Sequence, residues 1–116
     1  MTNVVRVKPG VEFTVIAPGG FLMLSAIQAA TSPLEMNMDL TITSACDGVH
    51  SGPDDPHHRG EAYDIRTHDM TSQQKTDCVA IIMGLLGWDQ FYGFLEDAGS
   101  DNEHIHVQVK KGTTYP

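Results

Sequence analysis

Histidine is frequent in this chain, and two of its histidines are spaced as metal ligands can be. The chain has 116 residues and 6 histidines. His104 and His106 alternate with the apolar residues Ile105 and Val107, so both project from the polar face of one predicted strand. Imidazole is the commonest metal ligand in proteins, so this strand can present one ligand beside a second imidazole. An exposed histidine pair without a metal fits the same spacing.

A second group lies upstream, where His57 and Asp64 are separated by a turn that contains Gly60. A turn of this length can bring both side chains to one point. Catalytic zinc takes three nitrogen or oxygen ligands from the protein and leaves a fourth position for water. His57, Asp64 and one histidine of the later strand would complete such a site. Asp64 could instead be a structural residue that pairs with Arg66, and the spacing leaves both interpretations open.

The upstream group also resembles a known family. It matches the H-x-x-G-x-A-x-D motif of the zinc D-alanyl-D-alanine peptidases at four positions, which are His57, Gly60, Ala62 and Asp64. The segment 103–106 (EHIH) resembles the closing E-x-x-H element of these enzymes. Both elements are similar to the hedgehog signalling domain, which shares the peptidase fold and keeps zinc. Motifs of this kind need the right structural context, and here two occur together in the expected order.

The resemblance implies a role for each site residue. His57, Asp64 and His106 would bind zinc, Glu103 would be the general base, and a protonated His104 would share the negative charge that develops on the substrate. The implied reaction is hydrolysis of a peptide bond in peptidoglycan stem or cross-link peptides. In an ideal strand Glu103 would point away from His104 and His106, so it can reach the site only if the strand begins after it.

The sequence departs from the family in the loop before His57. Asp47 stands where the family has the arginine of an S-G-Y-R pattern, which favours an L-alanyl-D-glutamate endopeptidase over a D,D-peptidase. His50 and Arg59 are weaker candidates for substrate binding. Asp55 could orient the ring of His57 or be a solvated loop charge. The alternative function is a zinc-stabilised binding or structural module without catalysis, such as a phage virion part.

Periodicity predicts a single α+β domain over 1–116, with a small, mainly antiparallel sheet and two helices on one face, as in the hedgehog and D,D-peptidase fold. The predicted strands are 11–15, 39–45, 61–67, 90–95 and 104–110. One predicted helix covers 21–30. A possible capping box at Thr71 and Gln74 opens the other, and Gly87 ends it. The apolar stripe of this helix is predicted at Cys78, Ile82, Leu85 and Leu86.

Composition limits the partners. The net charge of −8 disfavours nucleic acid as a partner. The 2 cysteines, Cys46 and Cys78, are expected to be free and buried. No signal peptide or membrane segment is apparent. We therefore expect a monomer, made in the cytoplasm, that acts on the cell wall after release or export, as a phage or prophage lysis protein would.

Overall fold

The computed structural model describes residues 2–47 and 55–112. Its elements are β1 (Val5–Val7), α1 (Pro18–Ala30), β2 (Leu40–Ser44), β3 (Ala62–Arg66), α2 (Ser72–Leu86), β4 (Phe91–Glu96) and β5 (His104–Val109). They form one five-stranded sheet in the order β1-β2-β3-β5-β4. The β1–β2 pair is parallel and the other three pairs are antiparallel. The predicted α+β class and the mainly antiparallel sheet are confirmed.

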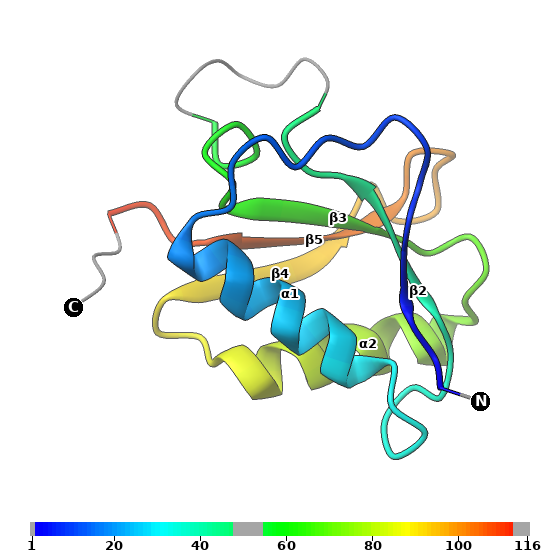
Figure 1. Cartoon of the computed structure of the whole chain (residues 1–116). Coiled ribbons are helices and arrows are strands. Elements are labelled where there is room, and N and C mark those ends of the chain that lie inside the picture. The colour runs from blue at the N-terminus through cyan, green and yellow to red at the C-terminus, as the bar shows by residue number, and fades with distance from the viewer. Residues whose placement is uncertain (1, 48–54, 113–116) are drawn as a thin grey trace.

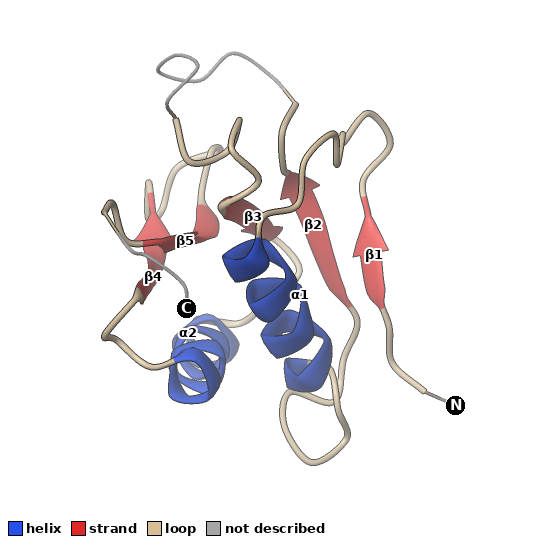
Figure 2. Cartoon of the chain, turned by 60° about the vertical axis from the view of Figure 1, so that its left-hand side comes forward, coloured by secondary structure: helices blue, strands red, loops and turns tan. Residues whose placement is uncertain are grey.

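Both helices lie on the same side of the sheet, and the sheet curves around α1 (Figures 1 and 2). The core fills the space between the helices and the sheet. It includes Ile105, Val107 and Val109 of β5, each at most 1% exposed. Because side chains alternate along a strand, His104, His106 and Gln108 lie on the opposite, outer face of the sheet. Within the described residues, no helix has the length and apolar character that crossing a membrane requires.

The start and end of α2 agree with the sequence signals. Thr71 Oγ1 accepts a hydrogen bond from Gln74 N at 3.1 Å, and Gln74 Oε1 accepts one from Thr71 N at 2.8 Å, which is a complete capping box.

Cys78 is buried and free, as is Cys46. The apolar stripe was predicted wrongly at Leu85, which is 54% exposed. Leu85 belongs to the last turn of α2, where it lines an open groove between the two helices.

The predicted strand at 11–15 is wrong, because the first strand is β1 and the segment 11–15 is a loop. Its apolar alternation has another cause. The ring of Phe13 packs on Tyr63 with ring centroids 5.7 Å apart, and Glu12 O accepts a hydrogen bond from Cys46 N at 2.8 Å. The loop therefore closes one end of the core without pairing as a strand.

α1 starts at Pro18, three residues earlier than predicted, and proline suits the first turn of a helix.

Gly60 is the residue of the H-x-x-G-x-A-x-D motif with the strictest steric requirement. Its φ is +70°, and a Cβ atom there would lie 2.2 Å from Val15 O. We expect Gly60→Ala to lower the free energy of unfolding by about 3 kcal/mol or more, because the left-handed conformation alone costs ~1–3 kcal/mol. Urea unfolding checks this, with Gly10→Ala as the control. Gly10 has φ +92° and open space around it, so an equal loss in both variants would contradict the steric explanation.

Candidate metal centre

The three predicted ligands lie together on the outer face of the sheet. His57, Asp64 and His106 each offer one ligand atom, and these atoms lie within 4.8 Å of one another. Asp64 on β3 is directly opposite His106 on β5 in the antiparallel register. His57 comes from the turn that precedes β3, and its Nε2 is 3.4 Å from Asp64 Oδ1. The turn and the two central strands therefore bring together residues up to 49 positions apart, from His57 to His106.

The ring of His57 is held with one nitrogen directed at this cluster. Its Nδ1 is 2.9 Å from Ala45 O, a carbonyl oxygen that can only accept a hydrogen bond. Nδ1 therefore donates to Ala45 O, and Nε2 is the ring nitrogen that faces Asp64. A hydrogen bond of this kind to the far ring nitrogen is the usual way in which proteins orient a metal-binding histidine.

His106 is oriented in the same manner from the other side. Its Nε2 is 2.7 Å from Gln108 Oε1, while Nδ1 is 2.9 Å from Asp64 Oδ1. The amide of Gln108 is itself fixed, because its nitrogen donates to Val109 O at 3.2 Å. Because Gln108 Oε1 and the Asp64 carboxylate both accept, His106 donates through both nitrogens, and a metal ion bound at Nδ1 would replace the proton shared with Asp64.

One nitrogen of each imidazole thus faces the carboxylate of Asp64, where a proton or a cation between them stabilises the arrangement. Burial disfavours a charge on Asp64, but the hydrogen bonds from His106 and His57 outweigh burial and hold its pKa well below the usual range. Burial likewise opposes a charge on His106, and the hydrogen bond to Asp64 overcomes it and raises the pKa. Two nitrogens and one carboxylate oxygen are a donor set that zinc favours. The residues present therefore fit a divalent metal ion.

His104 contacts the cluster from the next position along the outer face. Its Nε2 is 3.6 Å from Asp64 Oδ1 and 2.7 Å from Glu96 Oε1, and its Nδ1 is 2.7 Å from Asn102 O. Since both neighbours of the ring nitrogens accept hydrogen bonds, both nitrogens carry protons. Burial lowers the pKa of His104, but the Asn102 carbonyl and the charges of Asp64 and Glu96 outweigh it, so the net shift is upward. Sequence reasoning placed His104 here but missed Glu96.

Glu103, the predicted general base, is not brought to this cluster. β5 begins at His104, so Glu103 precedes the strand, as its predicted role requires. Its carboxylate instead contacts Lys75 Nζ at 2.5 Å, Thr67 Oγ1 at 2.7 Å and Gly99 N at 2.8 Å. These contacts tie the start of β5 to α2. A role as base would require the carboxylate to leave all three partners.

The contacts of Glu103 predict a pH-dependent contribution to stability. The hydrogen bonds from Lys75, Gly99 and Thr67 lower its pKa from 4.5 to about 2. A carboxylate with a lowered pKa stabilises the fold above its unfolded-state pKa, and this contribution is lost as the pH falls toward the folded-state pKa. We expect Glu103→Gln to lower the melting temperature at pH 7, and this difference from the wild type to vanish near pH 2. Lys75→Met should behave similarly, and a difference independent of pH would contradict this assignment.

The other predicted site residues have structural contacts. Asp47 Oδ1 accepts hydrogen bonds from Ala45 N at 2.9 Å and Glu12 N at 3.1 Å, so it shapes the turn after β2. Asp55 Oδ1 accepts from the backbone nitrogen of His57 at 2.9 Å. Arg59 pairs with Glu61 at 2.8 Å. His50 lies outside the described residues.

Solvent exposure of the cluster increases across the outer face of the sheet, from His57 to Glu96. The exposed fraction of the side chain rises from 6% at His57 and 11% at His106 to 19% at His104 and 40% at Glu96. Phe94 of β4 lies beside His106 with ring centroids 5.6 Å apart, and it stacks on Tyr92 at 5.9 Å. A molecule that reaches the cluster from solvent would therefore approach over the end of β4.

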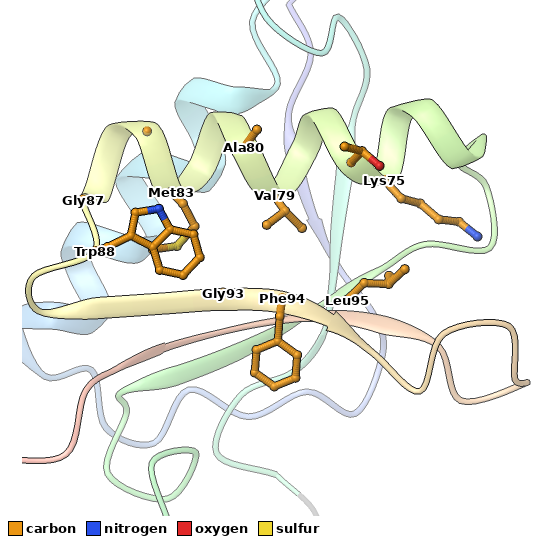
Figure 3. Close-up of a pocket in the computed structure, with 11 residues that line it drawn as sticks. Lys75, Val79, Ala80, Met83, Gly87, Trp88, Gly93, Phe94 and Leu95 are labelled. Carbon is orange, nitrogen blue, oxygen red and sulfur yellow. The ribbon is translucent and has the colours of Figure 1, made fainter.

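An apolar groove with a volume of about 790 Å³ lies elsewhere, between α2 and β4. Figure 3 shows Val79, Met83 and Trp88 on the helix side of β4, while the ring of Phe94 points to the opposite side. Its lining is mainly apolar and its one charged residue, Lys75, is paired with Glu103. The groove therefore has no group suited to hydrolysis, and we place the candidate site at the histidine cluster.

Comparison with protein-family models, with curated proteins and with solved structures gives no match. The geometry of the cluster and the motif resemblance are therefore what indicates a function.

Proposed function

We propose that this protein is a zinc peptidase of the hedgehog and D,D-peptidase fold, with His57, Asp64 and His106 as the metal ligands. One observation carries the proposal. Ala45 O and Gln108 fix the two rings so that one nitrogen of each faces the same carboxylate oxygen. A buried arrangement of this kind is costly unless a cation or proton neutralises it.

Zinc bound there would lower the pKa of a water molecule and polarise a substrate carbonyl. The chain supplies the remaining chemistry. His104, with protons on both nitrogens, is a donor next to the cluster that can stabilise negative charge on the substrate and give a proton to the leaving amine. Glu96 accepts a hydrogen bond from its Nε2. Glu103 remains the base implied by the motif, and Glu96 is the carboxylate that already contacts the cluster.

The proposed substrate is a peptide of bacterial peptidoglycan, which follows from the match to H-x-x-G-x-A-x-D. Asp47 in place of the family arginine favours an internal bond, such as L-alanyl-D-glutamate, over a C-terminal one, because a negative side chain cannot pair with a substrate carboxylate. The protein would act as a monomer on the cell wall after release or export. Neither nucleic acid nor membrane insertion has a part in this proposal.

The test is incubation of the zinc-loaded protein with purified peptidoglycan, followed by mass analysis of the released peptides. We expect peptides whose new ends identify a single type of bond, and no release in the presence of a chelator. Intact peptidoglycan after incubation with a protein shown to contain zinc would contradict the peptidase proposal.

The second candidate is a non-catalytic, zinc-stabilised module. The placement of Glu103 favours it, because the implied base is held by Lys75, Thr67 and Gly99 rather than by the cluster. This candidate requires zinc to raise the melting temperature while peptidoglycan remains uncut.

A further inference from the structure

Arg66 differs from the other two arginines of the chain in its contacts. Arg6 pairs with Asp39 at 2.9 Å, and Arg59 pairs with Glu61 at 2.8 Å. Within the part of the chain that the structure describes, the side chain of Arg66 makes no hydrogen bond or ion pair. Carboxylates are plentiful, since the chain has 15 Asp and Glu residues against 7 Lys and Arg residues. The five N–H donors of this guanidinium are therefore available to a ligand.

Arg66 lies on the same face of the sheet as the candidate metal centre. It is the last residue of β3, and it shares the outer face with Asp64, two positions earlier, because side chains alternate along a strand. Pairing between these two residues was one interpretation of the sequence, but Asp64 contacts His57 and His106 instead. Two residues of a strand span about 6–7 Å, so the long, partly exposed side chain of Arg66 can reach a group bound at the cluster.

Arg66 also lies beside the residue that the proposed reaction needs on the leaving-group side. His104 is directly opposite Arg66 in the β3–β5 register, and such side chains have Cβ atoms about 4.5–5.5 Å apart. In the proposed function His104 gives a proton to the leaving amine, so the substrate carbon that bears this nitrogen lies close to Arg66. No other lysine or arginine occurs in β3, β4 or β5.

We propose that Arg66 determines substrate specificity by binding a carboxylate on the carbon that bears the leaving nitrogen. The inference rests on the proposed function, since it presupposes a peptide held at the cluster. A γ-linked D-glutamyl residue has its free α-carboxylate in this position. The planar guanidinium can donate two parallel hydrogen bonds to such a group. Asp64 and Glu96 repel a negatively charged substrate, and the positive charge of Arg66 offsets this repulsion.

The experiment compares two peptides that differ only at this group. They are L-alanyl-γ-D-glutamyl-L-lysine with a free α-carboxylate and the same peptide with an α-amide. kcat/KM for both is measured with the zinc-loaded wild type, Arg66→Gln and Arg66→Lys. Calorimetry gives the Kd of the product γ-D-glutamyl-L-lysine and of its α-amide, which tests the contact without turnover. Lys8→Gln is the control, because it removes one positive charge at an exposed position elsewhere.

We expect the wild type and Lys8→Gln to prefer the carboxylate by roughly 10–100-fold in both measurements, as for a hydrogen bond to a charged group. Arg66→Gln should lose this preference and keep the wild-type rate with the amide, which also shows that the variant is folded. Arg66→Lys should retain part of the preference, because lysine keeps the charge without the planar fork.

Two results would overturn the inference while the peptidase proposal stands. One is equal cleavage of both peptides by the wild type, and the other is an unchanged preference in Arg66→Gln. If the wild type cleaves neither peptide, the peptidase proposal fails, and the calorimetric preference still decides whether Arg66 binds the carboxylate. A wild type that binds the product and its amide equally would then overturn the inference as well.

Discussion

His106→Ala should abolish tight zinc binding. The wild type is expected to bind one zinc ion per chain, and the variant should bind it more weakly by over ~100-fold, since losing even an outer partner of a metal ligand costs 10–100-fold. His106 supplies a ligand from the middle of the sheet, opposite Asp64, and no other described histidine can take its place there. Competition with a chromophoric chelator measures the change in affinity.

Two further variants make this result interpretable. Both side chains are buried, so either loss also affects packing, but His57→Ala removes its ligand from the turn before β3 and not from the sheet. Both should lose zinc and, with it, the zinc-dependent stabilisation, which is about 2.7 kcal/mol at a metal concentration of 100 times Kd. His68→Ala, at an exposed position, should retain both. Unchanged zinc affinity in His57→Ala and His106→Ala would refute the ligand assignment.

His104→Ala should separate catalysis from metal binding. Zinc content is expected to stay at one ion per chain, because His104 is held by Glu96 and Asn102 outside the ligand set. kcat/KM on a peptide released from peptidoglycan should fall by roughly 10²–10⁴-fold, the range for loss of a general acid or base. Metal analysis and a peptide hydrolysis assay on the same preparation check both halves of the prediction.

The matched control for this variant is again His68→Ala, which should retain both zinc and activity. If His104→Ala hydrolyses the peptide at the wild-type rate, His104 has no part in proton transfer. If it loses zinc together with activity, His104 is a ligand in the wild type. The second result would also favour the non-catalytic module, since its metal site would be closed.

Local sequence signals were sufficient for much of the fold. The capping box at Thr71 and Gln74 defines the start of α2 because both of its hydrogen bonds are made within four residues. The alternation along β5 correctly separates the core face from the face that carries His104 and His106, since the period of a strand is a local property. The pairing of Asp64 with His106 could not be read from either strand alone.

Elements that depend on distant partners were missed. β1 has three residues and pairs in parallel with β2, which lies more than 30 positions later, so it has no local pattern of its own. The segment 11–15 shows the opposite error. The packing of Phe13 on Tyr63 explains part of its alternation, whereas Val15 is 50% exposed. An apolar alternation can therefore occur in a loop laid against the core, without a strand.

In the candidate site, too, local sequence predicted some features, while others depend on residues that are distant in the sequence. The motif spacing brought His57, Asp64 and His106 together correctly, because a turn and two strands determine their positions. The environment of Glu103 depends on Lys75, which is far away in the sequence, so E-x-x-H could not reveal it. Glu96 could have been found, since a hairpin between the strands predicted at 90–95 and 104–110 places residues near its turn opposite one another.

The central prediction is that His57, Asp64 and His106 bind a metal ion together. A crystal of the full chain grown with zinc and measured at the zinc absorption edge tests it directly. We expect one strong anomalous peak, about 2.0–2.2 Å from His57 Nε2, Asp64 Oδ1 and His106 Nδ1. A map with no peak between these atoms, or with zinc bound only by other residues, would contradict it.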